Sequence, residues 1–139
     1  MKKKKSKLLT LLLVLLALTG CKDDKDGDWT PMAWRNVNFV VNDGENYFID
    51  ENGGTFTFEC TNYKSFWIDC VLVSGEDRII TDEGHISCKG EWFEMAIQGN
   101  KFIITIDPKP ASIESRALYV HISVGDTGTS FTFRQQKDE

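Results

Sequence analysis

Apolar and polar side chains alternate strictly along much of this chain, and this alternation limits the fold more than any other feature. It is clearest from Thr55 to Cys60, where Phe56, Phe58 and Cys60 fall on one side and polar residues on the other. Side chains two apart share a face of a β-strand, whereas a helix would repeat its apolar positions every three to four residues. No stretch after the N-terminal leader shows a sustained helical period. The sequence therefore predicts an all-β domain.

Segments with strand character recur along the chain, separated by Gly-, Asn- and Asp-rich turns at a spacing of roughly 8 to 12 residues. The expected strands are 37–41, 47–49, 55–60, 66–73, 92–97, 101–106, 118–124 and 131–136. In 37–41, Val37, Phe39 and Val41 are expected to be buried. This spacing predicts a β-sandwich of about seven strands. The residues expected to point inward are Phe56, Phe58, Ile68, Leu72, Ile104, Val120, Ile122, Phe131 and Phe133.

The N-terminus carries five lysines and then an apolar run, Leu8 to Leu18, interrupted by Thr10. This pattern is typical of an export signal, and the run is shorter than the roughly 20 residues of a membrane-spanning helix. The run ends in Leu18-Thr19-Gly20-Cys21, which resembles the lipobox of bacterial lipoproteins. The resemblance implies a signal peptide over 1–20 and a Cys21 thiol alkylated by a diacylglyceryl group, with acyl chains such as palmitate anchoring the protein. An ordinary secretory signal is the alternative.

Residues 21–28 are too charged and too poor in apolar side chains to fold by themselves, so they predict a tether. Lys22, Asp23 and Asp24 resemble the signal that sends lipoproteins of Bacteroidetes to the outer face of the outer membrane. We therefore expect an outer-membrane location facing the cell exterior. The aspartates do not form an EF-hand loop, because Gly27 stands in the wrong place and no Glu follows at the twelfth position.

Residues 29–139 form the expected folded domain. Of the 16 basic residues, five lie in the signal peptide, which leaves 11 against 21 acidic residues, a formal charge of −10. This charge disfavours a nucleic-acid partner. The domain has two histidines, His85 and His121, and no C-x-x-C pair, so we expect neither a metal site nor a cofactor. Whether any of Cys60, Cys70 and Cys88 form a disulfide is left open.

Several short motifs in a fixed order point to a family. They are Gly53-Gly54-Thr55-Phe56-Thr57-Phe58, Asn62-Tyr63, Phe66-Trp67-Ile68, Arg116-Ala117-Leu118-Tyr119-Val120 and Phe131-Thr132-Phe133-Arg134-Gln135-Gln136. Together they resemble the BACON-type immunoglobulin-like domains of Bacteroidetes surface lipoproteins, over roughly residues 53–136. The resemblance implies an immunoglobulin-like sandwich that binds carbohydrate or acts as a spacer. The antibody-type disulfide between the sheets is not expected, because residues 118–122 contain no cysteine.

Aromatic side chains are the feature that can carry a function, since sugar rings stack on flat side chains. Trp67 lies in a strand expected to cross the core, which favours packing over binding. Tyr63, in a polar turn, and Trp92, at the start of a strand, are the candidates for ligand binding. No nucleophile motif accompanies the histidines, so we do not expect an enzyme. The sequence leaves two functions open, a glycan-binding module and a structural or protein-interaction subunit of an envelope complex.

Overall fold

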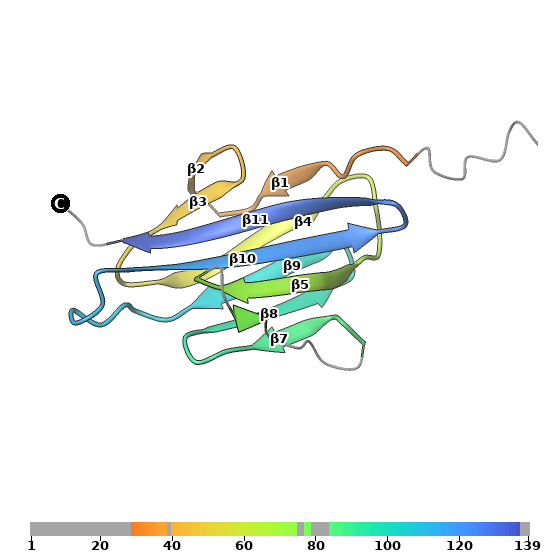
Figure 1. Cartoon of the computed structure of the whole chain (residues 1–139). Helices are drawn as coiled ribbons and strands as arrows, with labels where there is room; N and C mark the ends of the chain where they lie inside the picture. The colour runs from red at the N-terminus through yellow and green to blue at the C-terminus, as the bar shows by residue number, and fades with distance from the viewer. Residues whose placement is uncertain (1–28, 39, 75–76, 79–83, 137–139) are drawn as a thin grey trace, which may run out of the picture.

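The protein is a sandwich of two β-sheets, as a computed structural model of the whole chain shows. The structure describes residues 29–38, 40–74, 77–78 and 84–136, and these contain strands and turns but no helix. Cys21 and the segment Lys22, Asp23 and Asp24 lie outside the described residues, as do the signal peptide and the tether. In Figure 1, β11, β10 and β5 lie side by side in front of β4 and β9.

The two sheets have five and six strands among the described residues. In order across the five-stranded sheet these are β1 (Trp34–Asn36), β4 (Gly54–Cys60), β9 (Lys101–Ile106), β8 (Phe93–Gln98) and β7 (Ser87–Lys89). In order across the six-stranded sheet they are β2 (Val41–Asp43), β3 (Asn46–Ile49), β11 (Thr127–Gln136), β10 (Ser115–Val124), β5 (Trp67–Val73) and β6 (Asp77–Arg78). Neighbouring strands are antiparallel except β3 and β11, which are parallel.

The strand order is that of an immunoglobulin domain. Such a domain has seven strands, A to G, with A, B, E and D in one sheet and G, F and C in the other. Here β1, β4, β9 and β8 take the places of A, B, E and D, while β11, β10 and β5 take those of G, F and C. The prediction of an immunoglobulin-like sandwich of about seven strands is therefore confirmed for these seven strands. The short strands β2, β3, β6 and β7 extend the sheets beyond them.

Phenylalanines fill the space between the sheets. Phe58 and Phe102 from the five-stranded sheet meet Phe131 and Phe133 from the other, and all four side chains are at most 1% exposed. Ring centroids of Phe58 and Phe131 lie 5.0 Å apart, and those of Phe102 and Phe131 lie 5.3 Å apart. Phe58, Phe131 and Phe133 alternate with polar residues along their strands, so the period of two in the sequence places them inside.

Two of the expected inward residues are not fully buried, and a β-bulge explains one of them. The register between β5 and β10 shifts between His121 and Ile122, which adds one residue to β5. Ile68 and Val71 are therefore both buried, and Leu72 pairs with Tyr119 on the outer face. The prediction that Leu72 points inward was wrong, because the extra residue changes which side chains share a face. Phe56, near the start of β4, is half-buried and packs against the core.

The predicted strand over 37–41 was also wrong. The chain forms two short strands instead, β1 before this segment and β2 at its end, and they belong to different sheets. Val37 and Val41 are 54% and 56% exposed, and Val40 between them is buried. Phe39 lies outside the described residues. The chain crosses from one sheet to the other here, which interrupts the alternation that a continuous strand would have.

A buried glutamine ties together one end of the sandwich. Gln135 is 1% exposed, and its side-chain Nε2 donates to the carbonyls of Asp50 at 2.9 Å and Asp107 at 3.1 Å. Its Oε1 accepts a 2.7 Å bond from Nε of Arg116. The same end holds Lys109, which is 7% exposed and whose ammonium donates to the carbonyl of Ile113. These bonds satisfy the polar groups that the end loops bury.

Candidate functional site

The outer face of the six-stranded sheet carries an exposed tryptophan. Trp67, on β5, is 40% exposed, while its neighbour Ile68 is fully buried. The prediction that Trp67 packs in the core was therefore wrong. The strand does cross the core, but Trp67 stands on the side of it that faces solvent, and only the alternation with a buried Ile68 could have revealed this.

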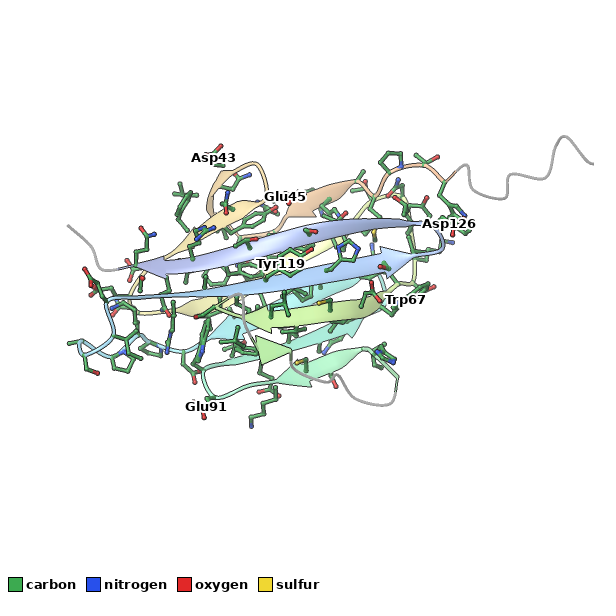
Figure 2. The ribbon with its side chains drawn as sticks, viewed as in Figure 1. Asp43, Glu45, Trp67, Glu91, Tyr119 and Asp126 are labelled. Atoms are coloured by element: carbon green, nitrogen blue, oxygen red, sulfur yellow. The ribbon has the colours of Figure 1, made fainter. Side chains whose placement is uncertain are left out.

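Three rings form a row on this face, which we call the aromatic row: Tyr119, His121 and Trp67. Tyr119 and His121 are successive outward residues of β10, and Trp67 on β5 pairs with Ser123, the next outward position. From Tyr119 to Ser123 is four positions, or about 13 Å along the strand. Figure 2 shows Trp67 at one end of β5 and Tyr119 near the middle of β10. The row therefore runs along the sheet rather than across it.

Ser130 connects two members of the row. Its Oγ lies 2.9 Å from the hydroxyl of Tyr119 and 3.0 Å from Nδ1 of His121. Ser130 stands on β11 directly opposite His121, so the two meet through the β10–β11 register. Sequence reasoning missed this contact because the residues come from different strands. Pairing the two strands across the turn at Gly125 would have found it.

A serine beside a histidine raises the question of nucleophilic catalysis. A Ser–His pair works when a third group orients the imidazole and donors stabilise the developing oxyanion. The partner of His121 in the described part of the chain is Ser130, and no carboxylate contacts its ring there. The Ser130 hydroxyl also bonds to Tyr119, on an open sheet face. The geometry is that of a polar bridge that fixes two ring orientations.

Tyr63 lies at the end of the sandwich where the described chain begins. Its hydroxyl donates to the carbonyl of Thr30, and its ring lies 6.3 Å from that of Trp29. The Trp29 ring in turn covers Gly125 in the β10–β11 turn, where a Cβ would come within 2.4 Å of it. Gly125 also has a φ of 54°, which favours glycine. Tyr63 and Trp29 thus hold the N-terminal segment against this end.

Trp92 lies at the other end, beneath an arginine. The Cζ atom of Arg116 is 4.3 Å from the Trp92 ring centroid, a cation–π contact, and Nη2 of Arg116 donates to the carbonyls of Asp107 and Pro108. Burial lowers the pKa of Arg116, and the charge of Asp107 acts in the opposite direction. Trp92 is half-buried and packs against the core, so it supports the loops at this end.

The two residues selected from the sequence are therefore far apart. Tyr63 belongs to the end marked by Gly125, and Trp92 to the end marked by Arg116. Arg116 and Gly125 mark the two ends of β10 and are nine residues apart, which corresponds to about 30 Å along an extended strand. The structure does not bring Tyr63 and Trp92 together into one platform. Both are half-buried, whereas the sequence suggested that they were the aromatic residues least committed to packing.

Other chemistry-bearing residues of the described chain do not converge. Cys60 and Cys88 are buried on β4 and β7, which are separated by β9 and β8 in one sheet, and Cys70 is half-buried on the other sheet. Within residues 29–38, 40–74, 77–78 and 84–136, no three His, Cys, Asp or Glu side chains are grouped to hold a metal ion. The described part of the chain also contains no helix long and apolar enough to span a membrane.

Comparison with known proteins gives a structural match but no family. No family model matches the chain, and no curated protein does either. A solved structure described as the NMR structure of a protein from Bacteroides thetaiotaomicron is similar to it, with 27% identity and a TM-score of 0.70. The match covers 84% of this chain and 96% of that one. Titin domain M7 matches with 9% identity and a TM-score of 0.45, over 80% of this chain and 100% of that one.

Proposed function

We propose that this chain is a non-catalytic, lipid-anchored module of the cell surface that binds glycan on the outer face of its six-stranded sheet. The observation that carries the proposal is the exposed Trp67 in line with His121 and Tyr119. A sugar chain laid along β10 would stack its apolar C–H faces on these rings. The resemblance to BACON-type domains supports the same function.

Polar groups beside the row suit a glycan better than an apolar ligand. Ser130 and Thr132 stand on β11 opposite His121 and Tyr119, and both present hydroxyls on the same face. Sugars combine apolar ring faces with a rim of hydroxyls, so they need rings and hydrogen-bonding groups side by side. The face offers both, on two long paired strands that hold it rigid.

Attachment through the lipid anchor would leave the binding face accessible. Trp29, the first described residue, is held at the Gly125 end of the sandwich, so a tether of eight residues, 21–28, joins the domain there. The opposite end, with Arg116 and Trp92, then points away from the membrane. The aromatic row runs between the two ends and faces sideways, where a long polymer could reach it.

The row is tested by Trp67→Ala. We expect the affinity for a bound glycan to fall about fivefold, because one aromatic stacking contact contributes about 1 kcal/mol and 1.4 kcal/mol corresponds to a factor of ten. Binding is measured by a glycan array followed by titration calorimetry. The matched control is Trp29→Ala, which removes a tryptophan of similar exposure, 44%, from outside the face. Equal losses in both variants, or none in either, would argue against the face.

The anchor is tested by Cys21→Ser. We expect the variant to leave the membrane fraction or to remain unprocessed, because lasting attachment needs the two or three acyl chains that the cysteine would carry. Fractionation of cells and the mass of the protein are the measurements. Asp23→Ala with Asp24→Ala should keep the attachment but reduce digestion by protease added to intact cells. A Cys21→Ser protein that stays in the membrane at its mature mass contradicts the anchor.

The second candidate function is binding of a protein partner, and an exposed apolar pair on another part of the sheet favours it. Val41 and Phe48 form a cross-strand pair on the outer face of β2 and β3, and they are 56% and 40% exposed. β2 is also an edge strand, whose free backbone groups could pair with another chain. Val41→Lys should then abolish binding of a partner from the same envelope complex while leaving glycan binding intact.

A further inference from the structure

A hollow continues the aromatic row toward the Arg116 end of the sheet. It has a volume of about 460 Å³, within the range of about 300 to 1,000 Å³ typical of small-ligand sites. Its lining residues are Ser74, Ser115, Arg116, Ala117, Tyr119, Thr132, Arg134 and Gln136. Tyr119 belongs both to this lining and to the row, so the two form one continuous surface.

The hollow exists because small side chains lie between large ones. Ala117 stands on β10 between Tyr119 and the end of the strand, opposite Arg134 on β11. On its other side Ser74 donates its backbone N–H to the Ala117 carbonyl at 2.8 Å. Ala117 and Ser74 thus form a low floor, and the Tyr119 and Arg134 side chains rise at its sides.

The charge of the hollow is opposite to that of the protein. Among the residues that the structure describes, its lining contains two arginines and no carboxylate, although acidic residues outnumber basic ones 21 to 16 in the chain. Arg116 lies at the rim with its guanidinium held by Gln135, by backbone carbonyls and by the Trp92 ring. Arg116 therefore adds positive potential, but its orientation is fixed by the end loops.

Arg134 has the donors that a ligand would use. Its Nε donates to Oδ1 of Asn46 at 2.9 Å, which fixes the guanidinium plane. In the described part of the chain Arg134 makes no ion pair, and the Nη atoms have no hydrogen-bond partner. A planar fork of free N–H groups matches a carboxylate or a sulfate, which it can bind through two parallel hydrogen bonds.

We propose that the hollow is a subsite for an acidic sugar unit, and that Arg134 binds the anionic group of that unit. The inference rests on the proposed glycan-binding function and specifies its ligand class. A polysaccharide stacked along the row passes over Tyr119 into the hollow, where a carboxylate or sulfate ester meets the Arg134 fork. The hydroxyls of Ser74, Ser115 and Thr132 surround the same space and suit the sugar hydroxyls.

The test compares polymers that share a sugar backbone and differ in whether they carry an anionic group. Purified full-length protein in detergent is titrated with polygalacturonate and with its fully methyl-esterified form, and with dextran sulfate and unsubstituted dextran. We expect tighter binding of the charged polymer in at least one pair, and the pair that shows it distinguishes carboxylate from sulfate. Arg134→Gln should weaken that binding about tenfold to a hundredfold, the effect of losing a hydrogen bond to a charged group.

Two further variants complete the design. Ala117→Phe fills the floor from the solvent side and should reduce binding of the charged polymer while the thermal unfolding midpoint stays near that of the parent protein. Lys101→Gln removes an exposed cation on β9 of the other sheet and should change nothing, which controls for overall charge.

The outcomes separate the two proposals. If charged and uncharged polymers bind equally, and Trp67→Ala weakens both while Arg134→Gln does not, the acidic-sugar inference is overturned and the glycan-binding function stands. A preference for the charged polymer that survives Arg134→Gln also overturns the inference. If no polymer on this panel or on the glycan array binds, the proposed function fails, and the inference fails with it.

Discussion

Phe131→Ala is expected to lower the free energy of unfolding by about 3–5 kcal/mol, because it removes a large ring from a tightly packed site. Phe131 is fully buried, and its ring contacts those of Trp34, Tyr47, Phe58 and Phe102, with centroid distances of 5.0 to 5.6 Å. These neighbours come from both sheets, so they cannot close the space without moving the sheets together. A domain of this size has a total stability of about 5–15 kcal/mol.

Urea unfolding followed by tryptophan fluorescence measures this loss. The matched control is Phe48→Ala, which removes the same side chain from a position 40% exposed on the outer face of β3. We expect the control to change the stability by no more than about 0.5 kcal/mol, as is usual for exposed positions. Similar midpoints for the two variants would contradict the assignment of Phe131 to the centre of the core.

Gln135→Leu is expected to cost about 2–3 kcal/mol, although leucine fills nearly the same space. The Nε–H of Arg116 would lose its acceptor, and hydrogen bonds to charged groups contribute about 1.5–3 kcal/mol. The carbonyls of Asp50 and Asp107 would each lose one donor and keep another, from Gly53 and Arg116 respectively. The loss arises from unsatisfied polar groups rather than from a cavity.

The control for this variant is the next residue. Gln136→Leu makes the same chemical change at an exposed position and should leave the unfolding midpoint nearly unchanged. Hydrogen exchange of the amides in the 107–114 loop is a second measurement, and we expect faster exchange in Gln135→Leu. A Gln135→Leu protein as stable as the parent would show that these bonds contribute little net free energy.

The outer face of the six-stranded sheet shows how a correct strand prediction can still misplace a residue. The sequence predicted a strand over 66–73, and β5 spans Trp67–Val73. It also suggested that a tryptophan in such a strand is packed, because large aromatic residues usually are. Trp67 is next to Ile68, which the sequence placed inward, so the alternation of neighbouring residues puts Trp67 on the solvent face. The bulge at His121/Ile122 comes after Ile68 in β5, so it changes the face of Leu72 and not that of Trp67. A single extra residue in the ladder has no clear signature in the sequence.

What the sequence determined by itself is the local pattern. The alternation of Phe56, Phe58 and Cys60 fixed β4 as a strand, and the turn residues fixed the spacing of a sandwich, because period and turn chemistry are properties of neighbouring residues. The fold class follows from these. The predicted signal peptide, the lipid anchor at Cys21 and the surface location remain predictions from the same kind of local evidence.

What only the tertiary structure decided is which distant residues meet. Tyr63 and Trp92 were chosen as separate local features, and the fold places them at opposite ends of β10, where each supports a loop. Trp67, Tyr119 and Arg134 come together on one face because β5, β10 and β11 are adjacent in the sheet. That adjacency is set by pairing between strands up to about sixty residues apart in the chain, which no local period encodes.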